Sequence, residues 1–351
     1  MKAKGFVLAG VVLMVALLAG CRAKTTPGGR NVSPPPPPPR PTASAYPLGE
    51  GQTLGEPIVH ANMAVYPVRS SVQAEVADYL TLDEALQKGL IEVTEKDQAE
   101  VNEVYVTNLA DLPVYLMAGE VILGGKQDRV VAKDTIVPAQ AKKYPVRVFC
   151  VEPHRWIGAT EQFRESKLEA SPAVRKAAQV SEDQARVWEE VARANRQARV
   201  APASGAYRAS AVESDTAKSA QAYVNAIAPQ LKQDREAVGM VVALDGKVVG
   251  ADVYASQALF RKLQGKLLAS HAREAVAAVR PGAAAAPPPS ATDAVRFLQR
   301  ARTGQTVKRE ARGAAETTQL RNEAALGFQT AAPAAAGAPR QVLHENYYRN
   351  E

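Results

Sequence analysis

Short apolar runs rich in β-branched and aromatic residues recur along the first half of the chain, separated by turn-forming residues. Runs of this composition are typical of β-strands. The connections between them are too short for the helical crossovers that parallel strands require, so the pattern predicts an antiparallel sheet. The expected strands cover residues 58–68, 101–106, 113–123, 129–137 and 144–152.

Helices are indicated where apolar residues recur at intervals of three and four behind a capping residue. Thr81 with Glu84, and Ser181 with Gln184, have the spacing of a capping box. Ser171 stands directly before a proline, as is typical of a first helical turn. Further helices are expected over 212–227, from about residue 256, and over 294–301. Pro229, just after the first of these, is expected to break or restart that helix.

The clearest hairpin covers residues 238–254, where Asp245 and Gly246 join two β-rich arms. This dipeptide favours the two-residue type I′ turn. The pattern as a whole predicts an α+β fold, in which an antiparallel-rich sheet packs against several amphipathic helices. Weaker extended stretches end the chain at 307–310, 317–321 and 341–348.

The N-terminus has the pattern of a targeting segment. Lys2 and Lys4 precede an apolar run over 6–20, which is shorter than the roughly 20 residues of a membrane-spanning helix and predicts a signal peptide over 1–20. The run ends in Leu-Ala-Gly-Cys, which resembles the lipobox of bacterial lipoproteins and implies acylation of Cys21. An ordinary secreted protein is the alternative. Several acyl chains make a lasting anchor. We therefore expect a cell-envelope protein held to the membrane, at the outer membrane facing the periplasm if the cell has two membranes.

Residues 21–56 are rich in Pro, Gly, Ser and Thr and include six consecutive prolines at 34–39. This composition predicts a disordered, extended linker, with its cations near anionic lipid head groups. A proline-binding partner is the alternative. The folded part is expected to be a single α+β domain over 57–349. A low-complexity Ala/Pro insertion at 280–291 is expected to be a mobile excursion on its surface.

Charge and cysteine content narrow the function. The net charge of +7 falls to about +5 without the two lysines of the signal peptide, and much of the remainder belongs to the linker. Because no aromatic-basic interleaving accompanies it, nucleic acid is not an expected partner. The four histidines lack metal-ligand spacing and no phosphate loop occurs, so no metal and no cofactor is expected. If Cys21 carries lipid, Cys150 has no partner within the chain, and stability must come from a packed core.

Residues 119–131 form the least ordinary stretch, because a glycine pair interrupts an apolar run and is followed by Lys126, Gln127, Asp128 and Arg129. One interpretation is a solvated hairpin tip whose glycines permit the turn. The other is an anion site, in which the two cations hold the anion while the amide and the carboxylate contact its polar edges. The sequence leaves both open.

The strand over 144–152 leads into a second candidate. Cys150 fits a small core residue, and a nucleophilic thiol, which would need a nearby base, is the alternative. Glu152, Arg155 and Trp156 leave the strand together, either as a buried ion pair under an aromatic ring or as a ligand clamp. Between residues 120 and 155 there are seven Lys or Arg against four acids, which favours an anionic ligand.

The order of these segments resembles the ARPP domain family, the ADP-ribosylglycohydrolase- and rhodanese-phosphatase-associated protein domain. The resemblance spans roughly residues 57–348 and is most specific at Gly-Glu-Val-Ile-Leu-Gly-Gly-Lys-Gln-Asp-Arg (119–129) and Cys-Val-Glu-Pro-His-Arg-Trp (150–156). It implies a shared fold and a link to nucleotide or ADP-ribose metabolism. It supplies no catalytic residues.

The expected function is a membrane-anchored binding or accessory module for an anionic small molecule or an envelope protein. One alternative is a hydrolase acting on nucleotide or ADP-ribose-type substrates, with Asp128 or Glu152 as the acid or base, and another is a purely structural envelope protein. Whether the protein is an enzyme therefore stays open. The candidate ligand-binding residues are Lys126, Gln127, Asp128, Arg129, Glu152, Arg155 and Trp156.

Overall fold

The computed structural model describes residues 45–72, 74, 76–96, 102–155, 162–280, 282, 284–333 and 337–350. The expected signal peptide, Cys21, most of the linker and Trp156 lie outside the described residues. Within them, helices and strands form an α+β fold dominated by antiparallel sheets, and this confirms the fold class predicted from the hydrophobic pattern.

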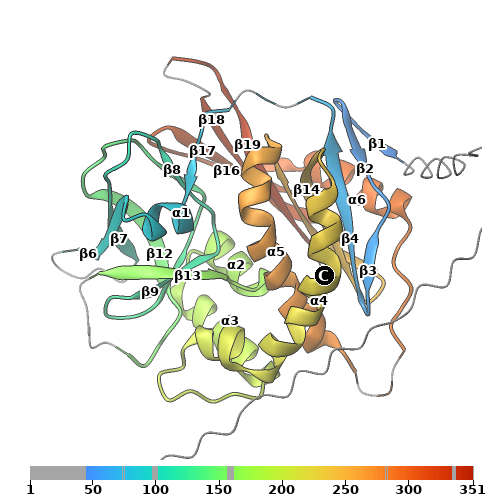
Figure 1. Ribbon diagram of the computed structural model, residues 1–351, viewed down its shortest axis with the longest axis horizontal. Coiled ribbons are helices and arrows are strands. Elements are labelled where there is room, and N and C mark those ends of the chain that lie inside the picture. Colours follow the sequence, from blue (N-terminus) through green and yellow to red (C-terminus); the bar gives the residue numbers. More distant parts are fainter. Residues whose placement is uncertain are drawn as a thin grey trace, which may run out of the picture. The chain divides into compact units, whose positions relative to one another are not determined.

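A 10-stranded antiparallel sheet contains the first and the last strands of the described chain. Its order is β1-β2-β4-β14-β15-β19-β18-β17-β16, with β3 paired to β4 (Figure 1). The central strands β4 and β14 are buried along almost their whole length. The bounds are β1 Tyr46–Gly49, β2 Gln52–Leu54, β3 Ile58–His60, β4 Met63–Ser70, β14 Ala237–Leu244, β15 Lys247–Tyr254, β16 Gln305–Arg312, β17 Ala315–Arg321, β18 Ala325–Pro333 and β19 Arg340–Arg349.

The strands between residues 80 and 169 form two smaller sheets. One has six strands in the order β13-β9-β10-β12-β7-β6, and the other has three in the order β11-β8-β5. β5 pairs with β8 in parallel, whereas β8 and β11 are antiparallel. The bounds are β5 Leu80–Thr81, β6 Ile91–Glu95, β7 Glu103–Asn108, β8 Val114–Leu116, β9 Glu120–Gly124, β10 Arg129–Val131, β11 Thr135–Val137, β12 Tyr144–Cys150 and β13 Phe163–Glu169.

Helices cover both faces of the large sheet at its centre. Because successive side chains of a strand point to opposite faces, Val65 and Val242 pack with α4 and α5, whereas Ala64 and Val241 pack with α6. Both faces of β4 and β14 are therefore apolar. The bounds are α1 Leu82–Gln87, α2 Pro172–Val180, α3 Gln184–Gln197, the π-helix η1 Ala209–Glu213, α4 Asp215–Gln233, α5 Gln257–Ala278 and α6 Ala291–Arg302.

Several local signals of the sequence are confirmed. The Thr81 side chain accepts a hydrogen bond from the backbone N–H of Glu84, whose carboxylate accepts one from the backbone N–H of Thr81. Ser171 caps α2, with a proline at its first position. In the β14–β15 turn, Asp245 and Gly246 have φ values of 47° and 79°, the left-handed conformation that a type I′ turn requires.

Three expected strands are divided in the structure. Residues 58–68 form the hairpin β3–β4 instead of one strand. The stretch 113–123 gives β8 to the three-stranded sheet and β9 to the six-stranded sheet, and 129–137 gives β10 to the six-stranded sheet and β11 to the three-stranded sheet. The chain therefore changes sheets twice where the sequence shows nearly continuous apolar runs.

Buried carboxylates stabilise these changes of direction. Glu120 accepts a hydrogen bond from the backbone N–H of Met117 at 2.8 Å. Asp134 accepts one from the backbone N–H of Ala118 at 2.8 Å. Because these backbone groups are bound by side chains, they are not available to continue the ladder, and the strands end there.

The second expected capping box is wrong. The residue that caps α3 is Asp183, whose carboxylate accepts from a backbone N–H in the first turn at 2.8 Å, while Ser181 ends α2. The Gln184 side chain instead binds the backbone N–H and C=O of Cys150, each at 2.8 Å. Gln184 thus fixes α3 to β12 rather than closing its own helix.

Pro229 does not break α4, which continues to Gln233. Ile227 and Leu231 lie on either side of the proline and are buried in the main core. Their packing compensates for the backbone hydrogen bond that proline cannot donate.

The strands β6, β13 and β18 were not expected from the sequence.

The folded part begins before the expected boundary at residue 57. β1 and β2 lie inside the segment 21–56 that was expected to be disordered, and both contribute to the large sheet. Leu48 and Leu54 explain this, because both side chains are buried in the core under α6. No helix among the described residues is both long and apolar enough to cross a membrane.

The Ala/Pro-rich segment is exposed but hydrogen-bonded to the rest of the fold. The backbone N–H of Ala286 donates to the Asp245 carboxylate at 3.2 Å, and the Tyr66 hydroxyl donates to the carbonyl of Pro289. Ser290 then caps α6. The described part of this segment therefore supports the β14–β15 turn.

Candidate functional site

The residues predicted from the two polar stretches do come together. The Arg155 guanidinium lies 2.6 Å from the Glu152 carboxylate and 3.0 Å from Asp128. The Gln127 side chain donates to the Glu152 carbonyl at 2.8 Å. We call Gln127, Asp128, Glu152 and Arg155 the Arg155 cluster. It joins the loop between β9 and β10 to the segment that follows β12, and Trp156 lies outside the described residues.

Glu95, which the sequence did not single out, completes this region. Its carboxylate lies 3.2 Å from the guanidinium of Arg129, which also donates to the Gln127 carbonyl at 2.8 Å. The backbone N–H of Lys126 donates to Glu95 at 2.8 Å. Arg129 is completely buried, so its side chain offers no surface to a ligand.

The Arg155 cluster sets two carboxylates against one guanidinium, and Arg208 lies 3.8 Å from Asp128 as a second cation. Burial raises the pKa of Asp128. Burial also opposes ionisation of Glu152, but hydrogen bonds from Arg155, Ser204 and the backbone of Asp128 together outweigh it and lower the pKa of Glu152. Burial raises the pKa of the Cys150 thiol to about 11, which favours the interpretation of Cys150 as a core residue over a nucleophile. These contacts hold the β9–β10 loop in place.

A second group of charged residues lies in the interior. We call Asp134, Glu169, Arg175, Asp252 and His344 the buried ionic network. Arg175 lies 2.7 Å from Asp252 and 3.6 Å from Glu169. His344 lies between two carboxylates, 2.6 Å from Asp134 and 3.2 Å from Asp252. The network connects the large sheet, through β15 and β19, to β13 and α2.

Pairing favours the charged forms of Asp252 and His344 despite their burial, whereas burial raises the pKa of Glu169 well above its usual range. Burial opposes the ionisation of Asp252, but Arg175 and His344 outweigh it and lower the pKa of Asp252. Burial also disfavours the imidazolium of His344, yet Asp134 and Asp252 together outweigh it and raise the pKa of His344. The Tyr254 ring stacks on the His344 imidazole with centroids 4.2 Å apart. The network thus connects the sheets through ion pairs in the interior of the fold.

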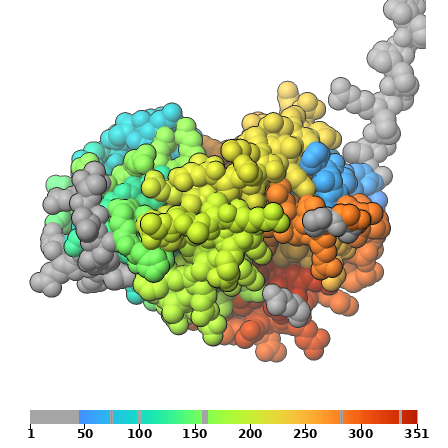
Figure 2. Space-filling model, turned by 90° about the horizontal axis from the view of Figure 1, so that it is seen from below, coloured from blue at the N-terminus to red at the C-terminus, as the bar shows by residue number. Residues whose placement is uncertain are grey.

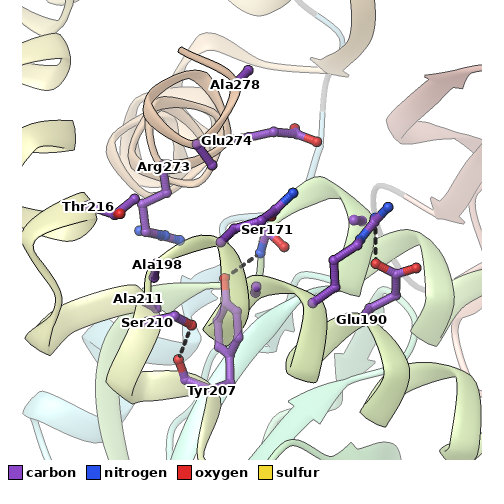
Figure 3. Close-up of a pocket in the computed structure, with 15 residues that line it drawn as sticks. Ser171, Glu190, Ala198, Tyr207, Ser210, Ala211, Thr216, Arg273, Glu274 and Ala278 are labelled. Carbon is purple, nitrogen blue, oxygen red and sulfur yellow. Dashed lines mark hydrogen bonds and ion pairs between the residues drawn. The ribbon is translucent and has the colours of Figure 1, made fainter. Parts of the chain in front are cut away.

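A cavity of about 210 Å³ lies where α2, α3, η1, α4 and α5 meet (Figure 3). Its lining includes Glu190 and Arg193 of α3, whose charged groups lie 2.5 Å apart, and Glu274 of α5. One carboxylate oxygen of Glu274 is buried without a hydrogen-bond partner among the described residues. Burial raises the pKa of Glu274 to about 7, and Glu190 acts in the same direction.

A larger groove of about 890 Å³ adjoins this cavity and shares Glu190, Arg193 and Glu274 with it. We call it the basic groove. In Figure 2 the yellow-green helical segments border the red C-terminal strands on this side of the protein. Its charged lining residues are Lys176, Arg186, Arg193, Lys247 and Arg349 against Glu189, Glu190 and Glu274.

Three cations of the basic groove keep their charge uncompensated. Arg186 and Arg193 form ion pairs with acids one turn away on α3. Lys176 of α2, Lys247 at the start of β15 and Arg349 at the end of β19 have no acidic partner among the described residues. No sequence motif contains these three residues, because they come from distant elements and only the fold brings them together.

The described residues contain no group of three or more His, Cys, Asp or Glu side chains placed to hold a metal ion. The structure thus defines an α+β domain with a basic groove between its helices and one end of its large sheet. The chain belongs to the family described as ARG and Rhodanese-Phosphatase-superfamily-associated Protein domain, ARPP-1, which matches residues 51–348. No curated protein and no solved structure matches the chain.

Proposed function

We propose that this chain is a cell-envelope lipoprotein, anchored through Cys21, whose ARPP-1 domain binds an anionic small molecule in the basic groove. One observation carries the binding proposal: Lys176, Lys247 and Arg349 line the groove and have no acidic partners among the described residues. The volume of about 890 Å³ lies within the range of roughly 300–1,000 Å³ that small-molecule sites occupy.

The basic groove suits an anion better than the Arg155 cluster does. In the cluster, Arg155 is bound by Asp128 and Glu152, and nearby Arg129 is completely buried. An anion there would have to displace carboxylates that already satisfy the cations. In the groove, Lys247 and Arg349 are exposed and would gain a partner on binding.

Calorimetric titration of the full-length protein in detergent with inorganic pyrophosphate tests the proposal. Removing a hydrogen bond to a charged group costs about 1.5–3 kcal/mol, so Lys247→Gln with Arg349→Gln should weaken binding at least about tenfold. The matched control is Lys232→Gln with Arg321→Gln, which removes the same charge from exposed positions outside the groove. Equal weakening in both pairs would reduce the effect to net charge and contradict a site in the groove.

The anchor proposal is supported by the Leu-Ala-Gly-Cys sequence at residues 18–21. Cells fed radiolabelled palmitate should label the wild-type protein, and the label should be lost in Cys21→Ser. Cys150→Ser is the matched control and should keep the label, because Cys150 is buried in the fold. Unlabelled wild-type protein recovered with its leader intact would refute the anchor.

Hydrolysis of nucleotide or ADP-ribose-type substrates is the second candidate. Glu274 favours it, because a carboxyl group with a pKa of about 7 beside a cavity can exchange a proton at neutral pH. Asp128 and Glu152, the acids expected from the sequence, are instead engaged with Arg155. Mass spectrometry of ADP-ribose incubated with the protein should reveal products that Glu274→Gln suppresses; an unchanged substrate pool contradicts hydrolysis.

A further inference from the structure

A second hollow continues the basic groove beyond the β14–β15 turn. It has a volume of about 420 Å³ and is lined on its outer side by α6 and by the loop before β18. We call it the far hollow. The two depressions share Lys247, Val248, Arg349 and Asn350, so they adjoin along one edge of the sheet.

Charge is distributed unevenly along this combined depression. The shared junction contains two cations, Lys247 and Arg349, and no acid. Each end contains charges of both signs. Lys176, Arg186 and Arg193 with Glu189, Glu190 and Glu274 line only the basic groove, and Arg296 and Arg300 with Asp293 and Glu323 line only the far hollow. The junction alone has cations without acids, so a bound molecule meets its strongest positive potential at its middle and polar groups of both signs at its ends.

The fold fixes the junction. Lys247 directly follows the type I′ turn, whose Asp245 accepts a hydrogen bond from Ala286. The Arg349 guanidinium donates to the Val248 carbonyl at 3.5 Å. A backbone carbonyl orients a guanidinium without neutralising it, so Arg349 keeps its charge for a ligand.

We propose that the basic groove and the far hollow form one site for a ligand in which a diphosphate joins two groups that bear hydroxyls or amines. This inference rests on the proposed function and specifies its ligand. Diphosphate oxygens at the junction accept hydrogen bonds from Lys247 and Arg349. At the far end Glu323, which has no ion-pair partner among the described residues, accepts hydrogen bonds from sugar hydroxyls or exocyclic amines. The other end charges pair as Arg186 with Glu189, Arg193 with Glu190 and Arg296 with Asp293, so they add no net attraction for a terminal phosphate. A molecule with phosphate at its end is therefore the poorer ligand.

Calorimetric titration of the full-length protein with four probes tests this arrangement. ADP-ribose has a central diphosphate between two ribose-bearing groups, whereas AMP and ribose 5-phosphate are its halves, and inorganic pyrophosphate is its centre alone. ADP-ribose should bind at least about tenfold more tightly than any of the other three. Lys247→Gln with Arg349→Gln should weaken ADP-ribose and pyrophosphate alike.

A substitution of Glu323, which lines only the far hollow, tests one end of the site separately from the junction. Glu323→Gln should weaken ADP-ribose binding several-fold and leave pyrophosphate binding unchanged, while Glu236→Gln, an exposed position outside both depressions, should change neither. Melting temperatures of all variants check their folding. If ADP-ribose binds no more tightly than pyrophosphate, and pyrophosphate still requires Lys247 and Arg349, this inference is overturned and the proposed function stands. If no probe binds, both are overturned.

Discussion

Replacing Asp252 by asparagine tests whether the buried ionic network holds the sheets together. The carboxylate lies 2.7 Å from Arg175 and 3.2 Å from His344, and all three side chains are nearly inaccessible to water. Asparagine has almost the same volume, so Asp252→Asn creates no cavity. The substitution removes one negative charge and leaves the cations in place.

The expected loss in the free energy of unfolding depends on which acidic partners His344 and Arg175 keep. Breaking a buried ion pair from one side costs about 3–5 kcal/mol. His344 keeps Asp134 at 2.6 Å, and Arg175 keeps Glu169 at 3.6 Å. Burial raises the pKa of Glu169 well above its usual range, but losing Asp252 should favour its ionisation beside Arg175. We therefore expect the lower end, about 3 kcal/mol, or a melting temperature lower by roughly 6–12 °C.

Urea unfolding followed by circular dichroism measures this loss. The matched control is Asp215→Asn, which removes the carboxylate of an exposed ion pair with Lys218 and should have no measurable effect. If Asp252→Asn lowers the free energy of unfolding no more than Asp215→Asn does, the network does not stabilise the fold.

The same variant has a characteristic pH dependence. The folded pKa of Asp252 is lowered, so its contribution is present above its ordinary pKa of 3.8 and is lost as the pH falls toward the folded value. The folded pKa of His344 is raised, so its contribution is complete below 6.5 and is lost as the pH rises through the folded value. The difference between wild type and Asp252→Asn should thus be largest between these two values.

Two further substitutions test separate parts of the fold. Gly119→Ala should destabilise the protein by about 3 kcal/mol or more, because Gly119 has a φ of 97° and a Cβ would lie 1.9 Å from Glu169. The control Gly89→Ala, at a φ of 63° with open space around the added Cβ, should lower the free energy of unfolding less in the same urea assay. ADP-ribose, whose diphosphate charge is constant from pH 6 to 8, should bind about two- to tenfold more weakly at pH 8, because Glu274 has a pKa of about 7 and loses its proton. Calorimetry on Glu274→Gln should show no such change, and a persistent pH dependence would assign it to another group.

Local features of the fold could be predicted because local chemistry determines them. The Asp245-Gly246 turn needs two residues that tolerate positive φ, and the capping box at Thr81 needs only a hydroxyl and an acid three residues apart. The division of 113–123 between two sheets could not be predicted in this way. Its cause includes a contact from a later segment, in which Asp134 binds the backbone N–H of Ala118, beside the local bond of Glu120 to the backbone N–H of Met117.

The candidate site could likewise be predicted only in part, because contacts between distant residues determine it. The polar run 126–129 correctly indicated that charged groups gather at this loop, and Glu152 and Arg155 do lie against it. A sequence records which charges are present but not whether they face one another or the solvent. Glu95 neutralises the region from a strand about thirty residues earlier, and nothing in its own surroundings marks it as a partner.

Uncompensated charge is therefore the property that separates the proposed ligand site from the charged groups that connect elements of the fold. His344, Arg175 and Arg155 are all bound by carboxylates of the same chain, and each connects elements of the fold. Lys247 and Arg349 have the opposite character, because they stand at the ends of neighbouring strands where no acid of the described chain reaches them. A bound anion would give both cations the partner that the described chain does not supply.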